Sequence, residues 1–434
     1  MDAEQLAGRG QARTADVVVV GAGVIGSSIA LELASSGRSV VVVDRASGPG
    51  QGSTSASSAV VRFNYSTWDG IALSWEAKHC WERWAEHLGG VDETGMACFH
   101  RVGMVFLDVD VAPLERVLPM FDRAGIPYEH WDADELAQRV PGIDPGRFWP
   151  PRRIDDPGFW EDATTRLGAL WTPDAGFVDD PALAAVNLAS SARRRGAAFL
   201  FGHAVTEVLG GTGTEGVRLS DGSVVSAPVV VNAAGPWSGA LNALAGVGAG
   251  WSVGVRPLRQ EVHRVPAPAG LNPSGALGPV LADLDLGTYV RPTPGEGLLV
   301  GGTEPECDPL QWLDDPDTSN PHATQQVFEA QVTRAARRFP LLGVPGKPVG
   351  LAGVYDVTDD WTPVYDRTER EGFHVAIGTS GNQFKNAPVV GRVMRAVLEG
   401  ETTVVGEHTG LEIGLAGFGR LRPPNADSTG TVMG

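Results

Sequence analysis

The sequence predicts an α/β fold, because it opens with a strand–helix–strand unit. Val17–Val20 and Val40–Val43 are short runs of β-branched apolar residues, the pattern of strands that are buried on both faces. Between them, Ile25–Ser35 has helical spacing and good helix formers, and Gly37 stands where a glycine commonly ends a helix. A third apolar strand is predicted much later in the chain, at Val229–Asn232.

Outside this unit, the predicted elements are a mixture of helices and strands. The Gly/Ser-rich stretch Gly48–Ser58 is predicted to be a loop, and the Gly- and Pro-rich chain after Leu411 to be irregular. Helices are predicted at Trp75–His87, Glu129–Val140, Asp180–Gly196 and Gln325–Phe339, and strands at Phe99–Arg101, Gly103–Leu107, Ala197–Phe201, Ala204–Leu209 and Val217–Leu219.

The composition excludes several classes of protein. Of the 434 residues, 57 are glycine and 31 are proline. Their combined share falls short of the roughly 25–30 % that marks disordered chains. The net charge of −18 argues against a nucleic-acid-binding protein, which normally shows a basic patch. Three scattered cysteines suit a reducing, cytoplasmic compartment. Residues 1–16 lack the pattern of a secretory signal, and glycines interrupt the apolar run 17–34, so we expect no membrane span.

A glycine-rich turn joins the first predicted strand to the first helix. Residues 21–26 read G-A-G-V-I-G, which is the G-x-G-x-x-G spacing of dinucleotide-binding units. Gly21 permits the tight turn, Gly23 lets the backbone approach a pyrophosphate, and Gly26 lets the helix pack closely on the strand. The helix N-terminus then presents free N–H groups to the phosphates.

Asp44 ends the second predicted strand, 18 residues after Gly26. A carboxylate in this position accepts hydrogen bonds from ribose hydroxyls and argues against a 2′-phosphate, which leaves FAD or NAD as the dinucleotide. The glycines alone do not separate these two. The N-terminal place of the motif, the Gly/Ser loop after it, and the late strand that runs into N-A-A-G-P-W-S at 232–238 favour FAD.

Further motifs follow in a definite order along the chain. They are F-V-D-D-P-A-L at Phe177–Leu183, V-N-A-A-G-P-W-S at Val231–Ser238, Y-V-R-P…G-L-L-V-G-G-T at Tyr289–Thr303 and G-T-S-G-N-Q-F-K-N-A-P-V-V-G at Gly378–Gly391. With these motifs, the chain resembles the amine- and amino-acid-oxidising flavoproteins over roughly residues 16–401. That family includes D-amino-acid oxidase, glycine oxidase, monomeric sarcosine oxidase, and the sarcosine and dimethylglycine dehydrogenases.

The resemblance implies two domains. An FAD-binding Rossmann-type domain of the glutathione-reductase-like kind is expected to carry an inserted antiparallel β-sheet domain that covers the isoalloxazine. The expected segments are 14–90, 177–245 and 349–410 for the FAD-binding domain, 91–176 and 246–348 for the substrate-binding domain, and 411–434 for an irregular tail.

The resemblance also implies how FAD is held. In the covalent sarcosine oxidases a cysteine links the flavin at the position of Gly353, and the histidine link of dimethylglycine dehydrogenases falls near Ala56, so we expect noncovalent FAD. Serine hydroxyls of the Gly/Ser loop are expected to bond the flavin phosphates. The expected FAD-binding residues are Gly21, Gly23, Val24, Ile25, Gly26, Asp44, Arg45, Gly52, Ser53, Thr54, Ser58, Val205, Ala234, Gly235, Trp237, Gly353, Gly381, Asn382, Gln383, Phe384 and Lys385.

Five residues are expected to be catalytic. Arg62 and Lys385 match the arginine and lysine that hold the substrate carboxylate in the sarcosine-oxidase branch, and a carboxylate in a low-dielectric pocket needs such charged partners. Tyr289 and Tyr355 match tyrosines that face the flavin and the substrate. Asn382 stands at the histidine of the family's S-G-H-G-F-K segment, and this departure indicates a substrate other than sarcosine.

The implied reaction is FAD-dependent oxidation of the C–N bond of a carboxylate-bearing amine. The substrate would be an amino acid or an N-substituted or cyclic amino acid, oxidised to an imine by hydride transfer to flavin N5. The lysine that activates dioxygen in sarcosine oxidase falls on Leu299, which leaves dioxygen or an electron-acceptor protein as the acceptor. Two alternatives stay open: an NAD(P)H-dependent flavin hydroxylase or reductase, and a flavin-binding subunit of a larger complex.

Two groups of potential metal ligands favour ordinary structural roles, and we expect no metal. One predicted helix carries His79, Cys80 and His87, without a carboxylate to complete a ligand set. The other group is predicted to lie in a solvated turn after a strand; it consists of Glu304, Glu306, Cys307 and Asp308.

Overall fold

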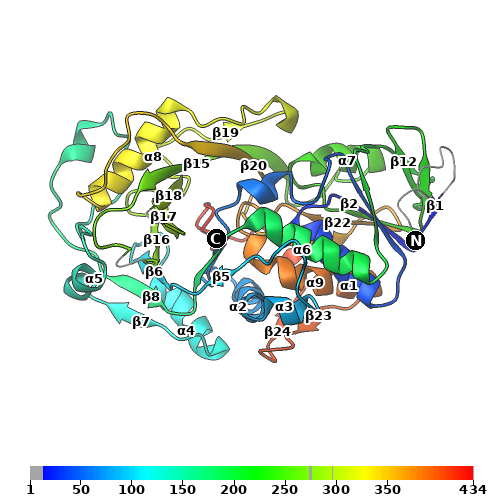
Figure 1. The fold of residues 1–434 in the computed structure, drawn as a ribbon, viewed down its shortest axis with the longest axis horizontal. Helices are drawn as coiled ribbons and strands as arrows, with labels where there is room; N and C mark the ends of the chain where they lie inside the picture. The colour runs from blue at the N-terminus through cyan, green and yellow to red at the C-terminus, as the bar shows by residue number, and fades with distance from the viewer. Residues whose placement is uncertain (1–12, 273–275, 296, 434) are drawn as a thin grey trace.

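A computed structural model describes residues 13–272, 276–295 and 297–433, and its two main sheets lie side by side (Figure 1). The first sheet has six strands in the order β10-β3-β2-β14-β22-β21, parallel except for the antiparallel pair β21–β22. These strands come from three distant parts of the chain. They are β2 (Val17–Val20), β3 (Val40–Asp44), β10 (Ala198–Phe201), β14 (Val229–Asn232), β21 (Val364–Arg367) and β22 (Phe373–Ile377).

Both faces of the six-stranded sheet are covered, as the unbroken valine runs predict. Along β2, Val17 and Val19 belong to the larger apolar core, whereas Val18 and Val20 belong to a second core on the opposite face. The helices α1 (Val24–Ser35), α6 (Pro181–Arg194) and α9 (Ala387–Glu399) pack together beside the sheet (Figure 1). The second core is completed by α7 (Ser238–Ala245) and a four-stranded sheet made of β1 (Arg13–Thr14), β11 (Val205–Leu209), β12 (Gly216–Leu219) and β13 (Val224–Ser226).

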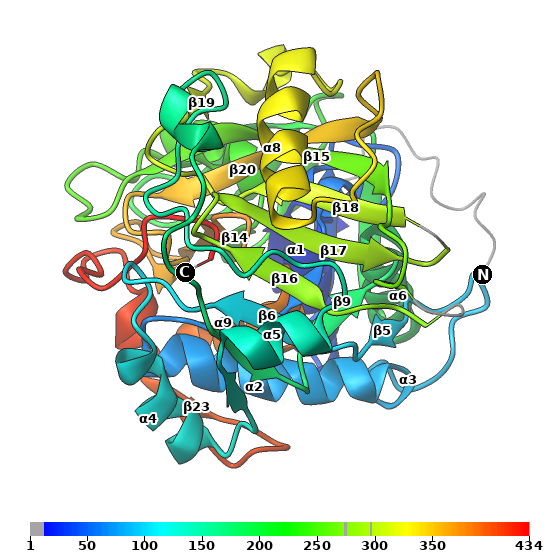
Figure 2. The same cartoon turned by 90° about the vertical axis from the view of Figure 1, so that its left-hand side faces the viewer.

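The second main sheet has nine strands, and all its pairs are antiparallel except β6–β16. Helix α8 (Gln325–Arg338) lies across β15, β17 and β18 (Figure 2). The strands are β6 (Met104–Leu107), β7 (Glu129–Trp131), β8 (Ala169–Thr172), β15 (Val255–Pro266), β16 (Val280–Asp283), β17 (Thr288–Thr293), β18 (Gly297–Gly302), β19 (Gln311–Trp312) and β20 (Gly350–Thr358). The predicted class, a Rossmann-type unit with a largely antiparallel second sheet, is thereby confirmed.

The remaining helices and strands lie outside these three sheets. The helices are α2 (Trp68–Glu82), α3 (Trp84–His87), α4 (Leu114–Ala124) and α5 (Ala133–Arg139), and the strands are β4 (Val60–Val61), β5 (Phe99–His100), β9 (Gly176–Val178), β23 (Thr403–Val405) and β24 (Glu412–Gly414). Among the described residues, no helix has the length and apolar character needed to cross a membrane. The expectation about a secretory signal concerns the start of the chain, of which residues 1–12 lie outside the described residues.

Two predicted helices differ in the structure. The helix expected from Trp75 begins at Trp68, because the Thr67 hydroxyl accepts the Gly70 N–H and caps it, and the helix is interrupted at Arg83. The helix expected over 129–140 is wrong in its first part. Asp132 caps a helix that starts at residue 133, and the three residues before it form β7.

Strand pairing in the structure crosses the boundary predicted at 349 and extends into the tail predicted to be irregular. The strand β20 falls inside the segment expected for the FAD-binding domain, yet it pairs with β15 of the nine-stranded sheet. The tail is not wholly irregular, since β24 pairs with β23 and the chain then returns to the interior. Val432 and Met433 are buried there, between segments that the sequence keeps far apart.

Candidate active site

A groove of about 1110 Å³ runs along the carboxyl ends of the parallel strands. This edge of a parallel α/β sheet is where such folds bind ligands. Most of the expected FAD-binding residues line it, namely Gly21, Gly23, Val24, Ile25, Asp44, Arg45, Gly52, Ser53, Thr54, Val205, Ala234, Gly235, Trp237, Gly381, Gln383 and Phe384. The expected residues that do not line the groove are Gly26, Ser58, Gly353, Asn382 and Lys385.

The glycine turn at the head of the groove has no room for side chains. A Cβ on Gly26 would lie 1.9 Å from the Gly21 carbonyl oxygen, so the glycine lets α1 pack directly on the turn. Gly21 has a φ of +108°, and its Cβ would lie 2.3 Å from the Ala233 oxygen. The turn therefore brings bare backbone to the groove, as binding of a pyrophosphate requires.

Asp44 holds this turn as well as facing the groove. Its Oδ2 accepts the Ala22 N–H at 2.6 Å, and its Oδ1 accepts the Ala46 N–H at 2.8 Å. The Thr54 hydroxyl accepts the Val24 N–H at 3.1 Å, which ties the Gly/Ser loop to the first turn of α1. Each carboxylate oxygen keeps a lone pair that a ribose hydroxyl can use.

Arg45 is engaged by a residue that the sequence analysis did not select. Its guanidinium pairs with both carboxylate oxygens of Asp317 and lies 4.3 Å from the centre of the Trp237 ring. Trp237 in turn donates its indole N–H to Asp317 at 2.9 Å. Asp317 lies in a short helical turn at 316–318, between β19 and α8. It is distant from Arg45 in the sequence, so no local motif reveals their approach.

Asp356 is a second groove residue that the sequence analysis missed. It is only 2 % exposed, and burial raises the pKa of its carboxyl. One oxygen accepts the Thr379 hydroxyl, and the other has no hydrogen-bond partner among the described residues. A buried, unpaired oxygen in a groove is a place for a ligand donor. Its only sequence signal is that it follows Tyr355. The free Asp356 oxygen can accept a hydrogen bond from a dinucleotide such as FAD, and the glycine turn leaves room for its pyrophosphate.

A small cavity opens where this groove ends. Its volume is about 50 Å³, and Tyr355, Gly381 and Phe384 line both spaces. All five residues expected to be catalytic also line it: Arg62, Tyr289, Tyr355, Asn382 and Lys385. The structure therefore brings together residues from four separate segments of the chain, next to the groove.

The two cations of the cavity are buried. Arg62 is 2 % exposed and Lys385 3 % exposed. Arg62 donates to the carbonyl oxygens of Asn64 and Val432, and Lys385 donates to the Tyr65 hydroxyl at 2.9 Å and to the Asn382 carbonyl. Within the described ranges, neither forms an ion pair with a carboxylate. Burial lowers the pKa of both groups, and for Lys385 the neighbouring Arg62 charge lowers it further.

The two tyrosines of the cavity stay protonated. Burial raises the pKa of Tyr289 to about 12 and that of Tyr355 well above its usual value. The Tyr289 hydroxyl lies 2.5 Å from the Ser58 hydroxyl, so Ser58 contacts the cavity rather than the groove. Gly381 leaves space for the Tyr355 ring, because a Cβ there would lie 2.4 Å from it.

Glu304 contradicts the prediction of a solvated turn. It is 9 % exposed, and burial raises the pKa of its carboxyl to about 8. Its backbone has a φ of +49°, which is unusual for a residue with a side chain. Glu306, two residues later, is exposed as expected. Because the segment is rich in charged residues, the sequence predicts that both acids are exposed to solvent. Only the folded structure shows that one of them is buried.

Gly353 and Ala56, which match the positions of covalent flavin links in the sarcosine oxidases and dimethylglycine dehydrogenases, lie next to each other in the structure. A Cβ on Gly353 would lie 2.7 Å from the Cβ of Ala56, so β20 packs directly against the Gly/Ser loop. Neither residue carries a nucleophile. Noncovalent FAD stays our prediction for this chain.

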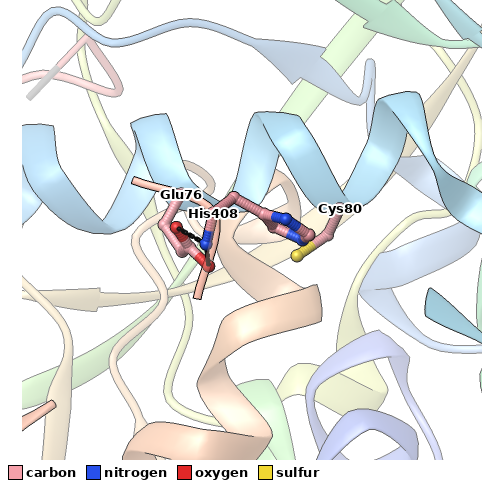
Figure 3. Close-up of side chains that lie close together, drawn as sticks. All are labelled: Glu76, Cys80 and His408. Carbon is pink, nitrogen blue, oxygen red and sulfur yellow. Dashed lines mark hydrogen bonds between the residues drawn. The ribbon is translucent and has the colours of Figure 1, made fainter. Parts of the chain in front are cut away.

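A group of possible metal ligands outside the groove has a structural role. Glu76, Cys80 and His408 lie together on α2 and the loop that follows β23 (Figure 3). The Glu76 carboxylate accepts backbone N–H groups of residues 407–409 at 2.8 to 3.2 Å and the Thr409 hydroxyl at 3.0 Å. Burial raises the pKa of the Cys80 thiol to about 12, so the thiol is protonated at neutral pH. We therefore read the cluster as the anchor of that loop.

Comparison with known proteins decides the family. Residues 16–397 match the model of the FAD dependent oxidoreductase family, DAO. This chain belongs to that family. The family relation makes FAD the cofactor, as the sequence predicts, and the groove is the candidate site for it.

Relatives of this FAD dependent oxidoreductase cover most of its length. It is 27 % identical to "FAD-dependent oxidoreductase domain-containing protein 1" of Xenopus laevis over 88 % of this chain and 79 % of the relative. It is 25 % identical to glycine oxidase of Geobacillus kaustophilus over 89 % and 94 % of the two chains. The solved structure of L-proline dehydrogenase from P. horikoshii shares the fold, with a TM-score of 0.72, 23 % identity and coverage of 90 % and 95 %.

Proposed function

We propose that this protein oxidises the C–N bond of an amino acid, or of an N-substituted or cyclic amino acid, to an imine. The observation that carries the proposal is the pair Arg62 and Lys385, buried in a cavity at the end of the FAD groove with no carboxylate partner among the described residues. Buried cations are normally paired, so this cavity favours an anionic ligand. The names of relatives, glycine oxidase and sarcosine dehydrogenase, support a carboxylate-bearing amine.

The residues of the cavity would bind and orient the substrate. Arg62 can offer two parallel N–H groups to a carboxylate, once its present carbonyl acceptors are exchanged. A carboxylate beside Lys385 would raise the pKa of that amine, which burial and the neighbouring Arg62 charge now lower, and so would favour its charged form. FAD, when bound, supplies the hydride acceptor for the carbon next to the amine.

The tyrosines would act as neutral groups. Because their pKa values are raised, Tyr289 and Tyr355 present hydroxyls rather than phenolates to the substrate at neutral pH. The rings of Tyr355 and Phe384, which line both the groove and the cavity, keep the junction of the two apolar. Excluding water there protects an imine from hydrolysis until it leaves.

The test is an anaerobic screen of amino acids and of N-alkyl and cyclic amino acids for bleaching of the flavin absorbance near 450 nm. We expect bleaching by at least one of these amines. Arg62→Ala and Lys385→Ala should each raise the half-saturating concentration by about 30-fold or more, because removing one partner of a buried charge pair costs about 2–5 kcal/mol. Arg101→Ala, at an exposed ion pair, is the matched control.

Other outcomes distinguish the alternatives. Rapid bleaching by NADH or NADPH, with none by amines, would identify a hydroxylase or reductase. Bleaching only after a partner protein is added would identify a subunit of a larger complex. If both cavity variants turn over every carboxylate substrate at the wild-type rate, the assignment of the two cations is wrong. Admission of air, with a peroxide assay, then separates an oxidase from a dehydrogenase.

A further inference from the structure

The last described residues of the chain lie in the cavity that the substrate would occupy. Val432 and Met433 line it beside Arg62 and Lys385, and they are 8 % and 6 % exposed. In Figure 1 the red segment that leads to the C mark lies between the two main sheets. With this segment in place the cavity measures about 50 Å³, whereas pockets that bind small molecules usually measure about 300–1,000 Å³.

Two hydrogen bonds of a single residue hold this segment. The Val432 N–H donates to Oε2 of Glu304 at 2.8 Å, and the Val432 carbonyl oxygen accepts from Nη2 of Arg62 at 2.7 Å. The two bonded atoms are joined through one Cα and one carbonyl carbon. An α-amino acid has this same N–Cα–C–O connectivity, with an amine as the donor and a carboxylate as the acceptor.

Each end of this arrangement would be better satisfied by an amino acid than by a peptide group. The second oxygen of Glu304 has no hydrogen-bond partner among the described residues, and a backbone N–H has only one proton to give. An amine or ammonium group carries more N–H donors. At the other end, the Arg62 guanidinium binds two neutral carbonyl oxygens, where one carboxylate could accept a stronger pair of bonds.

We propose that the Val432 backbone occupies the position of an α-amino acid substrate, that Glu304 is the acceptor of the substrate's amine N–H, and that Val432 and Met433 leave the cavity when the substrate binds. The inference rests on the proposed carboxylate role of Arg62. It adds the second anchor, which restricts the substrate to acids with an N–H group on the carbon next to the carboxyl. The strained backbone at Glu304 is consistent with a residue that is kept for function.

The first experiment follows the segment itself. Hydrogen exchange at the Val432 amide is measured in the FAD-loaded protein under nitrogen. The probes are a mixture of the L-amino acids with N-methylglycine and, separately, acetate. We expect slow exchange without a probe and about tenfold faster exchange with the amino-acid mixture. Unchanged protection of this amide in the mixture would overturn the proposal. This readout is separate from flavin bleaching. Loss of the Val432 protection without any bleaching would therefore reject the proposed oxidation but support the proposed binding of an amino acid at this site.

The second experiment tests Glu304 directly, by displacement of the segment and by flavin reduction. Glu304→Gln should raise the half-saturating concentration of the amino acid about 10- to 100-fold, because the amide can still accept an N–H but cannot ionise to pair with an ammonium, and hydrogen bonds to charged groups contribute about 1.5–3 kcal/mol. The affinity for acetate, which carries no amine, should stay within about twofold. Glu306→Gln, at the exposed acid two residues away, is the matched control. Equal losses for acetate and amino acid in Glu304→Gln would indicate a general structural defect and would contradict the assignment.

The segment can be loosened without touching either anchor. Val432→Pro removes the N–H that Glu304 accepts, and we expect it to lower the half-saturating concentration of the amino acid, because the chain then holds its place in the cavity through the Arg62 bond alone and competes less strongly. An unchanged or higher concentration would show that the segment is a permanent wall of the pocket, which would overturn the proposed exchange.

Discussion

The buried carboxyl of Glu304 predicts a specific dependence of stability on pH. Burial raises its pKa from 4.5 to about 8 in the folded protein. Between these two values the folded chain holds a proton on Glu304 that the unfolded chain has lost, so this group's contribution to the free energy of unfolding falls as pH rises. Each pKa unit corresponds to about 1.4 kcal/mol, so between pH 5 and pH 8.5 the loss amounts to about 4 kcal/mol at most.

The assay is urea unfolding of wild type and Glu304→Gln at these two pH values. The amide cannot ionise and can still accept the Val432 N–H. We expect the wild type to lose up to about 4 kcal/mol more than the variant between pH 5 and pH 8.5. Comparing the two proteins at both pH values cancels the other titrating groups. Glu306→Gln should follow the wild type. If Glu304→Gln shows the same pH dependence as wild type, Glu304 is not a buried acid, and the argument is refuted.

Three further predictions concern the cofactor and the second sheet. Gly26→Ala should purify with little or no FAD, because the added Cβ would lie 1.9 Å from a backbone oxygen. The measurement is the ratio of absorbance at 450 nm to that at 280 nm. The control variant Gly211→Ala, where nothing lies within 4 Å of the added Cβ, should keep its flavin. Arg338→Ala should lower the free energy of unfolding by about 3–5 kcal/mol, because it leaves the buried carboxylates of Asp283 and Asp285, which the arginine now binds at 2.8 Å, without a positive partner. Arg153→Ala, at an exposed ion pair, should not change the urea midpoint. Acid precipitation should release all FAD into the supernatant, and flavin that remains in the pellet would contradict noncovalent binding.

The local pattern predicted the elements that are built from consecutive residues. The valine runs predicted β2 and β3, and the glycine spacing predicted the turn between them, because burial on both faces and a tight backbone approach leave a mark on neighbouring positions. Asp180 likewise marked the start of α6. The prediction over 129–140 was wrong in its first part because a strand of three residues is too short to show an alternating pattern. In the sequence it therefore could not be distinguished from the capped helix that follows it.

The candidate site was predictable only in part. The motifs that resemble the family selected Arg62, Tyr289, Tyr355, Asn382 and Lys385, and the fold brings these residues to one cavity. The same reasoning assigned Glu304 to solvent and the end of the chain to an irregular tail. It had no means of finding Asp317 or Asp356, since a lone aspartate carries no periodic signal.

The sequence by itself determined the α/β class, the turn for the dinucleotide and the preference for FAD, since these depend on residues that are neighbours in the chain. Only the tertiary structure decided which acidic residues are buried and which segment fills the cavity. Arg62, Glu304 and Val432 are separated by 128 or more positions along the chain, and hydrogen bonds at 2.7 and 2.8 Å join them. The free energy of burying a charge depends on what surrounds it in space, and for Glu304 those surroundings come from the far end of the sequence.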